Sequence, residues 1–118
     1  MADKIKSHKD LRVWQESMTL VIEIYKTSEH FPNHELYGLV SQIRRASVSV
    51  ASNIAEGAGR KGNKEFARFL YIALGSLSEV ETQLEIALRL NYINSTEKTN
   101  KSIYFIRNML SNLIKSLN

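Results

Sequence analysis

The sequence predicts an all-α protein of one domain, an antiparallel up-down-up-down four-helix bundle over residues 1–118. One proline and five glycines in 118 residues leave few interruptions for helices. Apolar residues recur at steps of three and four in four separate segments. No segment alternates apolar and polar residues as a half-buried strand would. Helices are therefore expected at about residues 9–28, 35–56, 64–90 and 95–117.

The first expected helix carries two apolar faces. Ser7, followed three residues later by Asp10, is expected to cap its start. The fuller face is assigned to the core, and it consists of Leu11, Trp14, Met18, Val21, Ile22 and Tyr25. The second face consists of Val13, Leu20 and Ile24.

Pro32 separates the first two helices, because proline disfavours a helical conformation for the residue before it. Asn33 is expected to cap the second helix, with Glu35 in the first turn. Gly57 is expected to end it as a left-handed C-terminal cap. The core stripe is Leu36, Leu39, Ile43, Ala46 or Ser47, Val50 and Ile54. A stripe of smaller residues, which lets another helix approach closely, is Val40, Val48, Ala51 and Ala55.

The third and fourth helices show heptad spacing, the pattern of bundle packing. Asn63 is expected to cap the third helix, and Asn94 with Glu97 the fourth. The seam of the third is Phe66, Leu70, Ala73, Leu77, Val80, Leu84 and Ala87. The stripe of the fourth is Ile103, Ile106, Leu110, Leu113 and Leu117.

Several apolar residues fall outside these stripes. The third helix adds Phe69, Ile72, Ile86 and Leu90 to the second faces already named. A single bundle buries one stripe of each helix, so the additional faces predict burial against other copies of the chain. Tyr37 and Tyr71 lie off the core stripes and are further candidates for an interface.

Composition excludes several classes of protein. The chain has no cysteine, which removes disulfides, thiolate metal sites and a cysteine nucleophile. No apolar run approaches the roughly 20 residues needed to span a membrane. The polar start of the sequence lacks the apolar core of a signal peptide. A cytoplasmic location is therefore expected.

The positive charge is concentrated in one part of the sequence. The formal net charge is +4, and residues 44–68 alone carry six cations against two carboxylates. Residues 69–97 carry one cation against four carboxylates. The six cations are Arg44, Arg45, Arg60, Lys61, Lys64 and Arg68. They are the candidate nucleic-acid contacts, although ion pairing on a solvated surface is the alternative interpretation.

Gly57, Gly59 and Gly62 match the G-x-G-x-x-G spacing of dinucleotide-binding folds. That motif must follow a strand, whereas here it follows a helix, so an interhelical turn is the better interpretation. Arg60, Lys61 and Lys64 surround the start of the next helix, where free N–H groups attract anions. A phosphate-contact site at this turn is one interpretation, and an incidental cluster of surface charge is the alternative.

No constellation predicts catalysis, a metal or a cofactor. His30 and His34 flank Pro32, so they do not share a helical face, and no third ligand is evident. The serines of the second helix have no histidine nearby to act as a base. The third helix has glutamates but lacks the Glu-x-x-His pattern of di-iron bundles. We expect the protein not to be an enzyme.

Arg44 and Arg45 are adjacent in a helix, so they point about 100° apart. One is expected to flank the core and the other to be exposed. At least one is expected to pair with a carboxylate.

Several motifs together resemble the bacterial four-helix-bundle proteins encoded in intervening sequences of 23S ribosomal RNA genes. The resemblance spans about residues 10–93, and the fourth helix matches only in pattern. The motifs are Asp10-Leu11-Arg12-Val13-Trp14-Gln15, Phe31-Pro32, Glu35-Leu36-Tyr37-Gly38-Leu39, Gln42-Ile43-Arg44-Arg45-Ala46, Ser52-Asn53-Ile54-Ala55-Glu56-Gly57 and Gly59-Arg60. Further matches are Phe66, Phe69-Leu70, Ala73, Gly75-Ser76, Glu79, Glu81-Thr82-Gln83-Leu84 and Leu90.

The resemblance implies a ring-like homo-oligomer, commonly a homopentamer. It also implies kinship with the accessory variability determinant of diversity-generating retroelements, which works with a reverse transcriptase and nucleic acid. Ala51 stands where the family usually has proline, which should straighten the helix locally. By this resemblance Arg44, Arg45 and Arg60 match the proposed nucleic-acid contacts, and charge clustering adds the other three cations.

Two functions follow from these observations. The first is a homo-oligomeric protein that binds RNA or DNA without reading base sequence, with a nucleic-acid-processing protein as a candidate further partner. The second is a protein-interaction scaffold whose basic residues are mostly ion-paired. The partners of Arg45, Arg60, Lys61 and Lys64 discriminate between them, because free and clustered cations favour nucleic acid.

Overall fold

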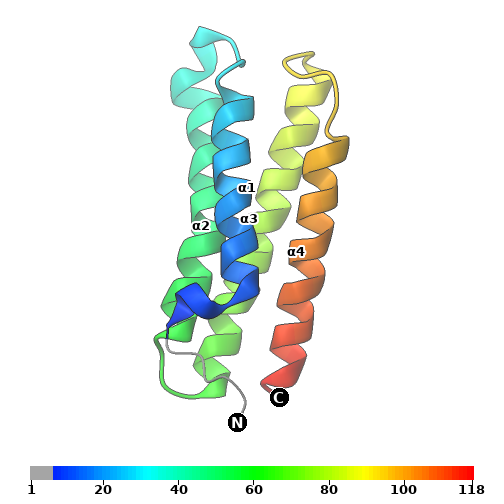
Figure 1. Cartoon of the computed structure of the whole chain (residues 1–118). Helices are drawn as coiled ribbons and strands as arrows, with labels where there is room; N and C mark the ends of the chain where they lie inside the picture. Colours follow the sequence, from blue (N-terminus) through cyan, green and yellow to red (C-terminus); the bar gives the residue numbers. More distant parts are fainter. Residues whose placement is uncertain (1–6) are drawn as a thin grey trace.

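The structure, a computed structural model, describes residues 7–118. That part of the chain holds four α-helices and no β-strand, which confirms the all-helical prediction. The helices lie side by side in an elongated body of 50 × 24 × 20 Å (Figure 1). They are α1 (Arg12–Ser28), α2 (Ser41–Ala58), α3 (Asn63–Arg89) and α4 (Glu97–Ser116).

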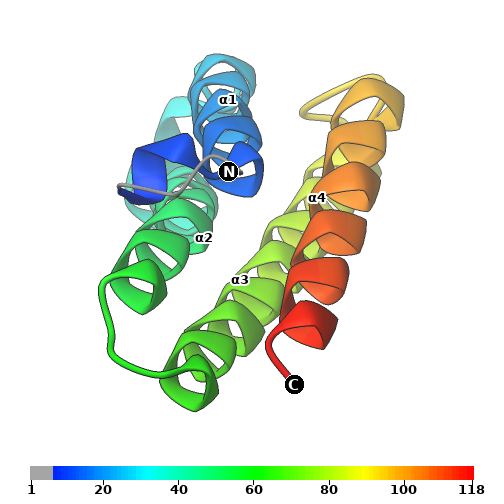
Figure 2. The same cartoon turned by 60° about the horizontal axis from the view of Figure 1, so that its bottom comes forward.

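The helices pack as a closed cycle. Both α1 and α3 pack against α2 and against α4, and the contact between α2 and α3 is the most extensive. The α1–α2 and α3–α4 connections lie at one end of the body, and the α2–α3 connection lies at the other (Figure 1). Viewed obliquely from that second end, α1 lies beside α2 and α3 beside α4 (Figure 2). Grooves lie between α2 and α3 and between α1 and α4.

The predicted helix at 9–28 is wrong at its start. Leu11 has an extended backbone with φ −78° and ψ 124°, so α1 begins only at Arg12. Before it, His8–Asp10 forms a short 3₁₀ turn. The capping pair is present but serves this turn: the Lys9 N–H donates to Ser7 Oγ at 3.2 Å, and the Ser7 N–H donates to Asp10 Oδ2 at 3.3 Å.

The predicted helix at 35–56 consists of three pieces. A 3₁₀ turn (Asn33–Glu35) and a π-helical segment (Leu36–Val40) precede α2, which runs two residues past the predicted end. Gly38, with φ −113° and ψ −110°, interrupts the helical path. Asn33 makes no side-chain cap. Instead the Leu39 N–H donates to Glu35 Oε1 at 3.0 Å, so a carboxylate supports the irregular turn.

The glycines near the end of α2 act differently from the prediction. Gly57 lies inside the helix, and a Cβ at this position would be 2.7 Å from the Cβ of Phe69 on α3. Its role is close helix packing and not a left-handed cap. The left-handed glycine is Gly62, with φ 84°, which occupies the cap position of α3 in place of the expected Asn63.

The ends of α3 and α4 lie within two residues of the predicted ranges 64–90 and 95–117. The expected capping box of Asn94 is wrong, because Thr96 occupies the cap position. The Glu97 N–H donates to the hydroxyl of Ser95 at 3.1 Å.

The core assignment for α1 is only partly correct. The second predicted face is buried, with Val13, Leu20 and Ile24 between 0% and 4% exposed. On the face assigned to the core, Leu11 and Val21 are also buried, and Trp14 packs against the core. The exposed members of that face are Met18, Ile22 and Tyr25, with Ile22 at 53%.

The core stripes of the other helices are largely confirmed. The stripe predicted for residues 35–56 is buried from Leu39, in the π-helical segment, to Ile54 in α2, whereas Leu36 is half exposed. In α3 the seam is buried from Leu70 to Ala87, and Phe66 packs at its edge. The buried residues of α4 include Ile103, Ile106, Leu110 and Ile114. Heptad spacing therefore located the core of α3 and most of α4.

Candidate functional site

The six predicted nucleic-acid contacts fall into two groups. Arg44 and Arg45 lie near the start of α2, and the other four surround the α2–α3 connection. Fifteen residues separate Arg45 from Arg60, which at 1.5 Å per helical residue is about 22 Å. The structure therefore does not bring all six cations into one site.

Arg44 is held by the C-terminal end of α1. Its Nε donates to the hydroxyl of Ser28 at 2.8 Å, and its Nη2 donates to the carbonyl of Tyr25 at 3.2 Å. The guanidinium also lies over the Tyr25 ring, 4.6 Å from the centroid. A cation is favourable at a helix C-terminus because the carbonyl dipoles point toward it. Arg44 thus joins two helices.

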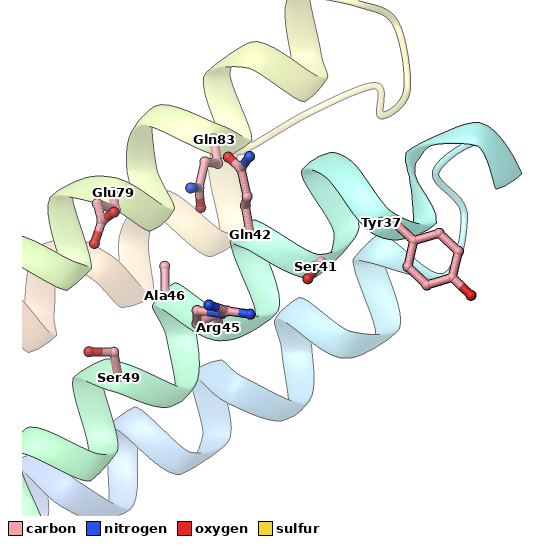
Figure 3. Close-up of a pocket in the computed structure, with 8 residues that line it drawn as sticks. All are labelled: Tyr37, Ser41, Gln42, Arg45, Ala46, Ser49, Glu79 and Gln83. Atoms are coloured by element: carbon pink, nitrogen blue, oxygen red, sulfur yellow. The ribbon is translucent and has the colours of Figure 1, made fainter.

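Arg45 lies in a groove between α2 and α3, in a cavity of about 450 Å³ (Figure 3). Its side chain is exposed and makes no hydrogen bond or ion pair with residues 7–118. Glu79 lines the same groove, but Figure 3 shows the two charged groups pointing to different parts of it. The expected carboxylate partner for Arg44 or Arg45 is absent from the described residues, so that prediction is wrong.

Arg60 and Arg68 are ion-paired on the surface. Arg60 Nη2 lies 2.7 Å from Glu56 Oε2, and Arg68 Nε lies 3.1 Å from Glu65 Oε2. Both guanidinium groups also lie over the Phe69 ring, at 5.0 Å and 4.6 Å from its centroid. Phe69 is only 9% exposed. These contacts fix two cations beside the start of α3.

The ion pair between Arg68 and Glu65 lowers the pKa of the carboxyl and raises the pKa of the guanidinium. The hydrogen bond from Arg68 holds the pKa of the Glu65 carboxyl below its usual value, although partial burial opposes this. The same hydrogen bond raises the pKa of Arg68. Both groups therefore remain charged at neutral pH.

Lys61 and Lys64 are exposed and have no ion-pair partner within residues 7–118. They flank the start of α3, where no side chain caps the helix. Uncapped N–H groups at a helix N-terminus attract anions. With Arg60 and Arg68, these lysines form what we call the basic turn: four cations and two carboxylates, with a net charge of +2.

The surroundings of three aromatic side chains were not predicted from the sequence. Phe69 was assigned to an additional apolar face, but it packs beneath two arginines. Tyr37, an expected interface residue, is 93% exposed at the mouth of the Arg45 groove. Phe105 is 60% exposed in a second groove with Arg12. Its position outside the heptad stripe of α4 was the available signal.

The structure gives no sign of a metal centre or a membrane span within residues 7–118. No group of three or more histidine, aspartate or glutamate side chains in this range is arranged to hold a metal ion. None of the helices described here is both long and apolar enough to cross a membrane.

These features define a small helical protein with exposed apolar side chains and a basic turn at one end. The chain belongs to the family described as 23S rRNA-intervening sequence protein, which matches residues 9–115. The resemblance seen in the sequence motifs is thereby confirmed at the level of the family.

One similar solved structure is a Bacteroides thetaiotaomicron protein with unknown function from the S23 ribosomal protein family. It is 27% identical to this chain, and the alignment covers 89% of this chain and 94% of that one, with a TM-score of 0.61. No curated protein is similar enough to count as a match.

Proposed function

We propose that this chain is a non-enzymatic, homo-oligomeric protein that binds RNA or DNA through the basic turn. The unit is an antiparallel up-down-up-down bundle, and copies of it assemble into a ring-like oligomer. The family resemblance implies that this ring is a homopentamer. Binding acts on phosphates by releasing counterions and does not read base sequence. The family's description, which refers to a 23S rRNA intervening sequence, supports RNA as the first nucleic acid to test.

The observation that carries this proposal is the state of Lys61 and Lys64. Both ammonium groups are exposed and free of carboxylates within the described chain, beside an uncapped helix N-terminus. Arg60 and Arg68 add positive charge, although each is shared with a glutamate. Repeating this turn around a ring would concentrate the positive potential.

Exposed apolar side chains support self-assembly. Met18, Ile22 and Val48 are between 38% and 53% exposed on α1 and α2, and Tyr104 and Phe105 are 60% exposed on α4. A ring needs two different contact surfaces on each copy, and these residues lie on different helices. The proposed kinship with the retroelement accessory determinant adds a nucleic-acid-processing protein as a candidate partner.

The test measures binding of a labelled structured RNA and a matched DNA across a salt series. Lys61→Glu/Lys64→Glu is compared with Lys26→Glu/Lys101→Glu, which makes the same change in net charge away from the turn. We expect the first variant to lose about tenfold or more in affinity at moderate salt. Its slope of log affinity against log salt should also become shallower, by about 0.9 for each duplex phosphate that is no longer neutralised. The control variant should keep most of the affinity.

The scaffold function remains the second candidate, because the Arg60–Glu56 and Arg68–Glu65 ion pairs occupy half of the basic turn. Absence of binding at low salt, by protein shown to be folded and oligomeric, would overturn the nucleic-acid proposal and favour the scaffold. Equal reductions in affinity for both variants would place the phosphate-binding residues elsewhere.

A further inference from the structure

Two of the seven arginines differ from the others in having no polar partner within residues 7–118. Five arginines make a hydrogen bond or an ion pair: Arg44, Arg60, Arg68, Arg89 and Arg107. Arg12 and Arg45 make neither, and both are exposed. Each of these two lines a groove between neighbouring helices, and in each groove a glutamate is also unpaired.

The first groove lies between α2 and α3 and holds Arg45 and Glu79 (Figure 3). Glu79 makes no ion pair within the described chain. The Oε1 atom of Gln83, in the same groove, is buried without a hydrogen-bond donor. Tyr37 stands at the mouth of the groove and is 93% exposed. This groove therefore offers a cation, an anion, an unused acceptor and an aromatic anchor.

The second groove lies between α1 and α4 and holds Arg12 and Glu16. These two residues are one helical turn apart, yet they form no ion pair with each other or with another described residue. The groove has a volume of about 430 Å³, and Ser102, Phe105 and Met109 also line it. It repeats the combination of an unpaired arginine, an unpaired glutamate and an exposed aromatic side chain.

We propose that the two grooves are the two sides of one contact between copies of this chain. Arg45 of one copy pairs with Glu16 of the next, and Glu79 pairs with Arg12 of the next. This inference rests on the self-assembly in the proposed function and names the surfaces that make it. It assigns Arg45 to the protein interface and leaves nucleic-acid binding to the basic turn.

The arrangement of the helices makes this contact head-to-tail. The α1–α4 pair and the α2–α3 pair lie on opposite sides of the four-helix cycle (Figure 2). Each pair carries one of the two grooves. A contact between two different surfaces can be repeated from copy to copy, and it closes into a ring when the rotation permits. A contact that used the same surface on both copies would produce a dimer and could not extend to further copies.

The charges determine the orientation of the neighbour. Arg12 and Glu16 follow one another along α1, with Cβ atoms about 6 Å apart. Arg45 and Glu79 lie on two neighbouring helices, whose axes are about 8–10 Å apart, and they line the same groove. The neighbouring bundle must therefore be inclined to this one for both pairs to form. Placing like charges together in such a contact is unfavourable, so charge complementarity also selects the register.

The test uses the full chain and measures its mass in solution by sedimentation and light scattering over a concentration series. Arg45→Glu and Glu16→Arg should each raise the dissociation constant of assembly by about tenfold or more. The double variant Glu16→Arg/Arg45→Glu should restore assembly. Glu16 and Arg45 line different grooves and form no ion pair within the described chain, so rescue by the double variant indicates a contact between copies.

Glu29→Arg is the control, because Glu29 is an exposed, unpaired glutamate outside both grooves, and assembly should be unchanged. Circular dichroism of every variant checks that the helices remain folded. Assembly that is insensitive to both single substitutions would overturn the inference and leave self-assembly intact. Rescue of Arg45→Glu by Glu79→Arg instead of Glu16→Arg would also overturn it. A monomeric wild-type chain would overturn both the inference and the proposed ring.

Discussion

Gly57 lies inside α2 where the backbone of that helix approaches α3. A Cβ there would be 2.7 Å from the Cβ of Phe69 and 3.0 Å from the Cδ1 of Phe66. Contacts this short force the two helices apart or the rings out of place, since protein interiors are close-packed. The absence of a side chain at this residue therefore sets the distance between α2 and α3 at this end.

We expect Gly57→Ala to lower the free energy of unfolding by about 1–3 kcal/mol, because overpacking outweighs the better helix propensity of alanine. Gly59→Ala is the matched control. The nearest atom to a Cβ at Gly59 is 3.6 Å away, and φ is −85°, so this change should be neutral or stabilise by about 0.4–1 kcal/mol. Urea unfolding of both variants checks this, and equal stabilities would contradict it.

Glu35 links the irregular turn before α2 to the connection after α3. Its carboxylate accepts from the Leu39 N–H at 3.0 Å and from the Tyr92 hydroxyl at 2.8 Å. These two hydrogen bonds hold the pKa of Glu35 below its usual 4.5, with a smaller lowering from His34. The bond with Glu35 is also the largest cause of the raised pKa of Tyr92.

This pKa predicts how the stability of Glu35→Gln depends on pH. A depressed folded-state pKa means that the ionised carboxylate stabilises the fold above about 4.5 and loses that contribution as pH falls through the folded value. The wild type should therefore exceed the variant in melting temperature most at neutral pH, and the gap should narrow below pH about 4.5. Thermal unfolding from pH 3 to 7 checks this, and a constant gap would contradict it.

At the scale of the element, α1 shows why an apolar stripe does not by itself identify the core. Both faces of this helix are apolar, and the one with more large residues is only partly buried: Met18, Ile22 and Tyr25 are exposed. The buried face contains Ser17, which weakened its apolar pattern. The Ser17 hydroxyl donates to the carbonyl of Val13 at 2.7 Å, so a polar residue is accommodated without a partner outside its helix.

The burial of α1 makes a direct prediction for two isoleucines two residues apart. Ile24 is fully buried, so Ile24→Ala should lower the free energy of unfolding by about 2–5 kcal/mol. Ile22 is 53% exposed, and Ile22→Ala should cost less than about 1 kcal/mol in the single chain. Denaturant unfolding of dilute protein checks the difference. A larger destabilisation at Ile22 would restore the face expected from the sequence.

At the scale of the whole molecule, the helix packing decides which charged residues lie together. Closeness in the sequence does not. The six cations predicted as one site occupy two regions, because Arg45 lies near the start of α2 and the basic turn follows its end. Arg44 is used to join α1 and α2, and Arg60 and Arg68 are shared with glutamates. The unpaired cations among the six are Lys61 and Lys64 at the basic turn and Arg45 in the α2–α3 groove. The proposed nucleic-acid binding and the proposed contact between copies therefore use different cations.

The sequence by itself determined the helical class, the number and order of the helices, and the core of α3. These follow from periodicity, because heptad spacing over a long helix permits one buried seam. The sequence motifs also predicted the family to which the chain belongs.

Only the tertiary structure decided which face of α1 is buried, why position 57 is glycine, and which cations have partners. Each of these depends on what a neighbouring helix presents at the same level, such as Phe69 opposite Gly57 or Ser28 beside Arg44. The periodicity of the sequence indicates the direction in which a side chain points from its own helix. Whether that side chain is buried or paired depends on the position of the neighbouring helix.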